Sequence, residues 1–247
     1  MTRLLSSLAA VLAITFVANA KTDRYALNVE NFSELEVVDG VNVEYKCNPD
    51  SAGWVAFECE PEFATRITFT NKNSKLTIQT TAEEQPFSDM PVVTVYSPAL
   101  QKVTNSGDST LVVTSCVPVK KFSARQIGNG TLVVKHIEAD KVDVAITAGN
   151  GSIEISGTAK SGKFSNVGTG NIKSDDLVIE EATCLVLGSG SIYCSPVESL
   201  KIYGAGSGQV IYTTTPEKVK NRSLGVKSMA AIKDVAPTSP DKYLSEN

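Results

Sequence analysis

A short pattern of glycine, polar and aliphatic residues recurs from residue 107 to residue 212. Each copy reads Gly-x-Gly-polar-aliphatic, except that the first copy lacks its second glycine. The second glycine position falls at residues 109, 130, 151, 170, 190 and 208, so successive copies are 21, 21, 19, 20 and 18 residues apart. A repeat this regular indicates one structural unit that is used several times.

Positions around the glycines keep the same character from copy to copy. Two residues after the second glycine position the side chain is aliphatic: Leu111, Leu132, Ile153, Ile172, Ile192 and Val210. The residue just before each of these is polar: Thr110, Thr131, Ser152, Asn171, Ser191 and Gln209. Such alternation predicts a strand with one buried face. A largely apolar row also precedes the glycines, so that apolar rows flank the corner on both sides: Ser106, Ile127, Ala148, Val167, Leu187 and Ala205.

A period near 20 residues, with strands and without a helical pattern, predicts an all-β fold, a right-handed parallel β-helix or β-solenoid. One coil cannot bury its apolar side alone, but stacked coils bury it against each other and join through backbone hydrogen bonds. Glycine suits the corners because it adopts positive φ without a steric clash. Gly-x-Gly also occurs in dinucleotide-binding loops, but here no helix follows it and it recurs too often.

The repeat divides the chain into four expected parts. Residues 1–20 form a signal peptide, residues 21–97 a strand-rich N-terminal capping region, residues 98–215 the solenoid coils, and residues 216–247 a degenerate last coil with a polar tail. In the capping region, Asp39-Gly40 between two alternating runs predicts a β-hairpin. Further strands are predicted at residues 54–59, 64–69, 75–80 and 91–96.

The first twenty residues have the organisation of a secretory signal peptide. Arg3 precedes a mostly apolar stretch over residues 4–17, and Ala18-Asn19-Ala20 then supplies the small residues that signal peptidase requires. The stretch is shorter than the roughly 20 apolar residues that span a bilayer. We therefore expect cleavage after Ala20 and an exported protein that is periplasmic, on the cell surface or secreted. We expect no transmembrane span in the mature chain.

The composition of the chain limits which partners and which kinds of site are expected. The chain has 23 Lys and Arg against 27 Asp and Glu, a net charge of −4, so nucleic acid is not an expected partner. It has one histidine, and it lacks the calcium-solenoid motif Gly-Gly-x-Gly-x-Asp, so we expect neither a metal nor a cofactor. Disulfides Cys47–Cys59 and Cys184–Cys194 are possible pairings. The alternative is that most cysteines, Cys116 included, are small buried apolar residues.

Several ordered segments carry a family resemblance. They are FSELEV at residues 32–37, VNVEY at 41–45, SKLTI at 74–78, VYSPAL at 95–100, the five complete Gly-x-Gly copies and VIY at 210–212. Over about residues 28–215 the chain resembles the putative auto-transporter adhesin, head GIN domain family. The resemblance implies a right-handed parallel β-helix, an exported protein of Gram-negative bacteria and an adhesin-like role, with no catalytic residues to carry over.

A β-helix enzyme that acts on polysaccharides requires acidic or basic groups that meet at one phase of adjacent coils. Glu154 and Lys173 share a phase and predict a surface ion pair. The other acidic pairs fall at different phases and are not expected to converge: Asp175 with Asp176, and Asp140 with Asp143. We therefore expect a non-enzymatic, adhesin-like binding module of the cell envelope. A carbohydrate-active lyase or hydrolase and a purely structural envelope protein are the alternatives.

The middle residue of each Gly-x-Gly unit is the candidate binding position. Stacked coils would place these small polar residues in one row along an edge: Asp108, Asn129, Asn150, Thr169, Ser189 and Ser207. A rigid row of amides and hydroxyls can contact a glycan or a host or matrix protein with little ordering cost. The alternative is that corners simply require short polar residues.

Overall fold

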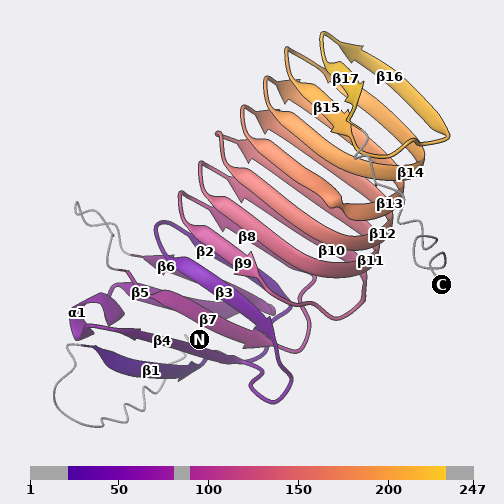
Figure 1. Ribbon diagram of the computed structural model, residues 1–247. Coiled ribbons are helices and arrows are strands. Elements are labelled where there is room, and N and C mark those ends of the chain that lie inside the picture. The colour runs from indigo at the N-terminus through magenta and orange to yellow at the C-terminus, as the bar shows by residue number, and fades with distance from the viewer. Residues whose placement is uncertain (1–21, 81–89, 232–247) are drawn as a thin grey trace, which may run out of the picture.

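The computed structural model describes residues 22–80 and 90–231; the expected signal peptide, residues 1–20, lies outside them. The described residues form a β-solenoid of about six turns, in which 17 strands belong to one hydrogen-bonded sheet (Figure 1). The only helix among them, α1 (Pro61–Ala64), is a single turn. The solenoid predicted from the repeat is confirmed.

Most strands of the solenoid lie on two faces, within which neighbouring strands run parallel. The β2 face contains β6 (Lys75–Thr80), β2 (Glu34–Val38), β8 (Lys102–Ser106), β10 (Val119–Ile127), the later parts of β11 (Thr131–Ala148), β12 (Ser152–Gly168), β13 (Asn171–Gly188) and β14 (Ser191–Ala205), and β16 (Lys218–Leu224). The β3 face contains β7 (Val92–Ser97), β3 (Asn42–Cys47), β9 (Thr110–Val113), the first parts of β11 to β14, β15 (Gln209–Tyr212) and β17 (Lys227–Ala230). Each glycine corner leads from the β2 face to the β3 face.

The register of the strands confirms the phase of the repeat. Thr131 pairs with Ser152, Ser152 with Asn171, and Asn171 with Ser191, so equivalent positions of successive coils lie side by side. The aliphatic row is fully buried, with 0% exposure at every member: Leu111, Leu132, Ile153, Ile172, Ile192 and Val210. Identical apolar positions therefore stack into a continuous core.

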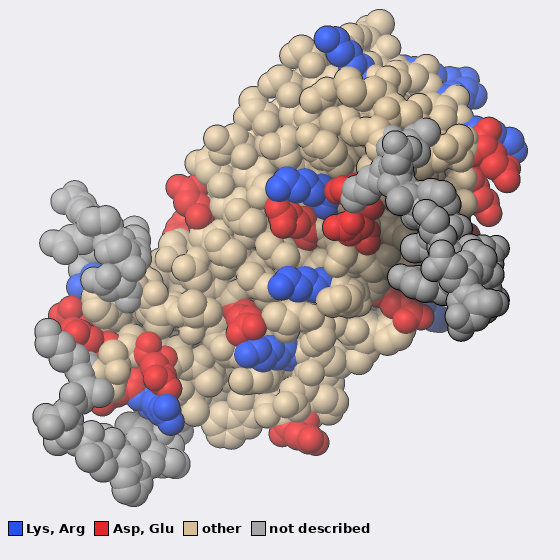
Figure 2. Space-filling view, viewed as in Figure 1, with Lys and Arg blue, Asp and Glu red and all other residues tan. Residues whose placement is uncertain are grey.

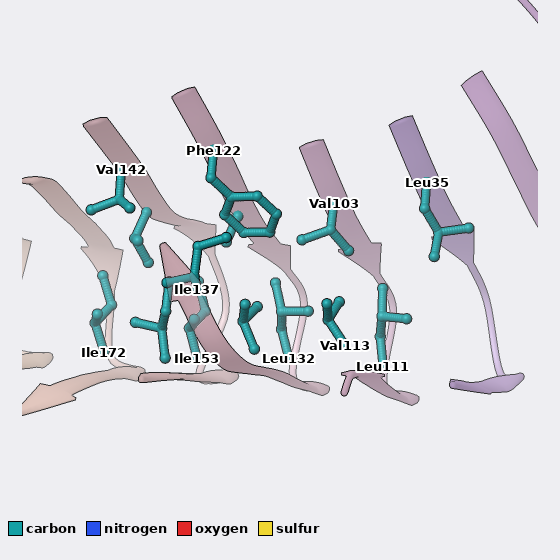
Figure 3. Packing of buried hydrophobic residues seen from close by; sticks show 14 of the residues in the cluster. Leu35, Val103, Leu111, Val113, Phe122, Leu132, Ile137, Val142, Ile153 and Ile172 are labelled. Carbon is teal, nitrogen blue, oxygen red and sulfur yellow. The ribbon is translucent and has the colours of Figure 1, made fainter. Parts of the chain in front are cut away.

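Side chains from the two faces meet inside the solenoid. Figure 3 shows residues of the β2 face and residues of the β3 face pointing toward one another between the two layers of strands. The first set comprises Leu35, Val103, Phe122 and Val142, and the second Leu111, Leu132, Ile153 and Ile172. Burial of each such side chain contributes roughly 1.5–3 kcal/mol.

The predicted hairpin at Asp39-Gly40 is wrong, because β2 and β3 do not pair with each other. β2 pairs in parallel with β6 and β8, and β3 with β7 and β9. Both residues have positive φ, 55° at Asp39 and 61° at Gly40, which a hairpin turn and a solenoid corner both accommodate. The Asp39 N–H donates to the carbonyl of Ser106, 3.0 Å away in the adjacent coil. β2 and β3 thus belong to a coil of the solenoid. This coil lies between the coil of β6 and β7 and the coil of β8 and β9.

Antiparallel strands close the N-terminal end of the solenoid. β4 (Trp54–Cys59) pairs with β7 and with β1 (Asp23–Asn28), and β5 (Ile67–Lys72) pairs with β6. The rings of Tyr25, Phe57 and Phe69 stack there, with centroid separations of 5.1 and 5.8 Å. At the other end, β16 and β17 are the last strands among the described residues and are almost entirely exposed.

Candidate functional site

The glycine corner is built by two close approaches between coils. Gly149 has φ 88°, and a Cβ there would lie 2.4 Å from the carbonyl oxygen of Gly128 in the preceding coil. A Cβ at Gly190 would lie 2.4 Å from the carbonyl oxygen of Gly170 in the preceding coil and 2.5 Å from the amide nitrogen of Asn166. Cβ atoms do not come this close to other atoms, so the backbone of the preceding coil requires both glycines, and a buried side chain adds to the requirement at the second.

Buried amide side chains line the inside of the corner. Asn105, Gln126 and Asn166 are completely buried and stand four residues before the second glycine position. The Asn105 amide donates to the carbonyl of Ser109 at 2.8 Å, and the Asn166 amide to that of Gly170 at 2.7 Å. These bonds satisfy carbonyls that the corner turns inward. The sequence analysis missed this row, although its recurring amides were a usable signal.

The six predicted edge residues are all exposed, and the corners that carry them stack along one edge. The side chain of Asp108 accepts hydrogen bonds from the backbone and side-chain nitrogens of Asn129, at 3.2 and 3.1 Å. The side chain of Asn129 accepts one from the backbone of Asn150 at 3.4 Å. Short polar residues thus tie consecutive corners together, as expected from turn chemistry. Their use in binding stays a prediction.

The apolar row that precedes the glycines faces solvent rather than the core. Val167 is 38% exposed and Leu187 is 42% exposed. The buried positions lie one residue earlier, and the alternation of the strand then turns the next side chain outward. The resulting apolar stripe borders the predicted edge: Ile127, Ala148, Val167, Leu187, Ala205 and Leu224.

A cleft of about 420 Å³ lies at the corner that follows the β3 face. At this corner β11 and β13 are each one residue longer than β12, so the shorter β12 leaves a hollow between them. Charged and titratable side chains line it: Lys135, His136, Glu154, Lys173, Asp175 and Asp176. The backbone N–H of His136 donates to the hydroxyl of Ser156 at 3.2 Å, and the φ of 56° at His136 reflects the bulge. The local irregularity thus builds a polar site that regular coils would lack.

The predicted ion pair in this cleft is confirmed. The Lys173 Nζ lies 2.7 Å from the Glu154 Oε1, and this hydrogen bond raises the pKa of Lys173. Both side chains are about half exposed, so the pair contributes less than about 1 kcal/mol to stability. Asp175 and Asp176 share this cleft with Glu154, whereas Asp140 lines a different groove. The extra residue in β13 shifts the phase of Asp175 and Asp176.

A second groove, of about 600 Å³, is lined by the middle parts of the long strands β11, β12 and β13 and by the start of β10. Its floor includes the small side chains of Ala139 and Ala159. Asp140 lies here, 2.7 Å from Lys160, and a hydrogen bond from that lysine lowers the pKa of Asp140. The Asp140 carboxylate is therefore engaged in an exposed ion pair.

Metal and disulfide chemistry have no assembled site within residues 22–80 and 90–231. No group of three or more His, Cys, Asp or Glu side chains is placed there to hold a metal ion.

All five cysteines are unbridged, with Cys59, Cys184 and Cys194 buried and Cys47 and Cys116 half-buried. A hydrogen bond with Cys194, together with burial, raises the pKa of Cys184. The described helices include none long and apolar enough to cross a membrane.

Figure 2 shows the charge on the side facing the viewer: acidic and basic groups lie close to one another in small clusters, with a largely uncharged surface between the clusters.

The profile of the family described as putative auto-transporter adhesin, head GIN domain, matches residues 31–216. The chain belongs to this family. The GIN domain match spans the solenoid coils, both glycine-containing and earlier ones, and stops before β16.

Solved structures share the fold of this GIN domain protein. A putative adhesin from Bacteroides fragilis has a TM-score of 0.73 at 19% identity, covering 85% of this chain and 98% of its own. A putative lipid binding protein from Parabacteroides distasonis has a TM-score of 0.66 at 17% identity, covering 85% and 98%. A putative adhesin from Parabacteroides merdae has a TM-score of 0.62 at 16% identity, covering 85% and 97%. Among curated proteins, none matches this chain in sequence.

Proposed function

We propose that the chain is an exported, non-enzymatic binding module of the cell envelope with an adhesin-like role. Membership of the GIN domain family and structural neighbours named as putative adhesins support a binding role. The observation that carries the proposal is the exposed edge of Asp108, Asn129, Asn150, Thr169, Ser189 and Ser207, which backbone hydrogen bonds hold in line over six coils. A rigid, repeated surface of this kind loses little entropy on contacting an extended ligand.

The proposed ligand is a glycan or a host or matrix protein that lies along this edge. The edge supplies hydroxyl and amide groups, and the neighbouring stripe supplies exposed apolar groups such as Val167 and Leu187. One structural neighbour is named a putative lipid binding protein, which adds lipid to the panel of ligands to be screened.

The test is a binding screen of glycans, matrix proteins and lipids with the mature protein. We expect a ligand whose affinity falls when Asn150, Thr169 and Ser189 are all replaced by Lys, because three long charged side chains obstruct the edge. A control with Thr68, Thr70 and Thr215 replaced by Lys adds the same charge at exposed positions elsewhere and should bind normally. Unchanged affinity of the edge variant, with an intact fold, would remove the edge from the proposal.

Export is the second part of the proposal. We expect the mature protein to begin at Lys21, after removal of Ala20 and the residues before it. Intact-mass measurement of the protein recovered from the periplasm or medium tests this. A mass that still includes the first twenty residues contradicts it.

The charged cleft favours a second candidate, a carbohydrate-active enzyme. Glu154, Asp175 and Asp176 meet His136 and Lys135 in one hollow, which is the type of convergence that polysaccharide cleavage needs. Incubation with neutral and acidic polysaccharides, followed by assay for new reducing ends, tests it. Product release by the parent that Glu154→Gln abolishes would replace the non-enzymatic proposal.

A further inference from the structure

One face of the solenoid is strongly basic although the whole chain carries a net charge of −4. From β10 to β16, the six strands of the β2 face present 18 outward positions, which hold eight basic and two acidic side chains, a net charge of +6. The basic residues are Lys121, Arg125, Lys141, Lys163, Lys201, Lys218, Lys220 and Arg222, and the acidic ones are Asp143 and Glu181. We call these eight cations and their strands the basic face.

Some acidic side chains lie near the cations of the basic face. Asp143 pairs in register with Lys163, and Glu181, Glu198 and Glu217 line one pocket with Lys201, Lys218 and Lys220. Within the described parts of the chain, none of the eight takes part in an ion pair. Earlier coils of the same β2 face differ, because Lys75 lies 2.5 Å from Glu36 and Lys102 lies 3.0 Å from Glu34. On the β2 face, ion pairs are therefore formed at the N-terminal coils, whereas the eight cations of the basic face take part in none among the described residues.

Like charges even lie next to each other on the basic face. Lys201 pairs in register with Lys220, and Lys121 with Lys141, on strands about 4.8 Å apart. Directly opposed like charges destabilise a sheet. An anionic ligand that bridges adjacent coils would relieve this repulsion.

We propose that the basic face binds an acidic polysaccharide that extends along the solenoid axis. This inference rests on the proposed binding function and names its ligand class. Cations lie in register on adjacent coils at two places, Lys121 with Lys141 and Lys201 with Lys220, at a spacing close to the length of one sugar residue. Hydroxyls lie on the same face between these two places: Ser123, Ser161, Ser165, Thr183 and Ser199. Tyr203, which is 36% exposed, lies beside Lys201 on the same strand and pairs in register with Arg222, so its ring offers a stacking surface for a sugar.

A polysaccharide fits this face better than a membrane does. Binding to a bilayer surface combines electrostatic attraction with insertion of apolar side chains. Among the 18 outward positions, Leu185 and Tyr203 are the only large apolar or aromatic side chains, and Leu185 is half-buried. The face therefore offers charge and hydrogen bonds in a regular array, with little apolar surface to insert.

The experiment compares two charge-matched variants of the mature protein on defined probes. The test variant carries Lys201→Gln, Lys220→Gln and Arg222→Gln. The control variant carries Gln in place of Lys46, Lys72 and Lys227, which removes the same charge from other surfaces. Binding to polygalacturonate, neutral dextran and vesicles of mixed zwitterionic and anionic phospholipid is measured at low and high salt. Circular dichroism confirms that both variants are folded.

We expect the parent and the control variant to bind polygalacturonate but not dextran. The affinity should fall at least about tenfold in the test variant, and it should fall in the parent as salt rises, because the contacts are ionic. Equal affinity of the test variant, or tighter binding of the parent to anionic vesicles than to polygalacturonate, overturns the inference. If the parent instead binds another glycan or a protein through the glycine edge, the inference fails while the binding function stands. Binding to no ligand in either screen overturns both.

Discussion

Replacing Ile153 with Asp tests the packing argument on which the solenoid rests. Ile153 is fully buried between Leu132 and Ile172, with which it pairs in register on either side. Ser152, one residue earlier, is half-buried and turned outward, where its hydroxyl donates to Thr131 at 3.3 Å. Ser152→Asp therefore places the same carboxyl one residue away but on the solvent side of the strand.

The expected magnitudes differ widely. Removing most of a buried isoleucine side chain costs about 2–5 kcal/mol, which Ile153→Ala measures alone. A carboxyl held in an apolar site has its pKa raised by up to about 3–5 units, which costs a further 4–7 kcal/mol or so at pH 7. Domain stabilities are about 5–15 kcal/mol, so Ile153→Asp should unfold the protein or nearly so. Ser152→Asp should cost less than about 1 kcal/mol.

The penalty at Ile153 should also depend on pH. The introduced carboxyl has a raised pKa in the folded state, so its ionisation penalises folding only above the unfolded-state pKa of about 3.9. The stability gap between parent and Ile153→Asp should therefore widen from pH 4 to pH 7. Thermal and urea unfolding followed by circular dichroism measure the gap. Equal destabilisation by Ile153→Asp and Ser152→Asp would show that the assignment of buried and exposed phases is incorrect.

Three further outcomes are expected. Gly149→Ala should destabilise the protein by about 2 kcal/mol or more, because φ is positive and the added Cβ meets the preceding coil's carbonyl at 2.4 Å. Asn150→Ala in the same corner should have a small effect. Urea unfolding compares the two variants, and equal destabilisation contradicts the close-approach argument. Glu154→Gln should cost less than about 1 kcal/mol and lower the pKa of Lys173 toward its ordinary value, as NMR titration would detect; an unchanged lysine pKa contradicts the ion pair. Burial raises the pKa of Cys116 to about 12, so at pH 8 iodoacetamide should alkylate it roughly 10³-fold more slowly than a free thiol. The alkylation rate should return to that of a free thiol in urea, and rapid labelling of the native protein contradicts this burial.

Local chemistry explains why so much of the solenoid was predictable. In a stack of coils with a period near 20 residues, equivalent positions lie side by side, so one aliphatic row such as that of Ile153 and Ile172 identifies the core. The strands at residues 54–59 and 75–80 were likewise set by their alternation, and the structure has β4 and β6 at those bounds.

Other features depend on pairing between distant segments. Asp39 and Gly40 have turn geometry that suits either a hairpin or a corner, and only the strands on either side, β6 to β9, decide which forms. The side to which Val167 and Leu187 point depends on strand phase at the corner, which apolar character alone does not report.

The candidate sites divide in the same way. The predicted edge from Asp108 to Ser207 follows from the glycine repeat, because corners of equal phase stack. The charged cleft required the one-residue bulges in β11 and β13, which bring Asp175 and Asp176 to Glu154 out of phase with the repeat. The basic face could be recognised only from which side of each long strand faces solvent. The net charge of −4 does not report it, because that value sums the basic face with acidic residues elsewhere in the chain. The sequence by itself therefore determined the repeating unit and its buried row. Tertiary packing decided which polar and charged groups from different coils share a surface, because side chains far apart in the chain meet only once the register of the strands is set.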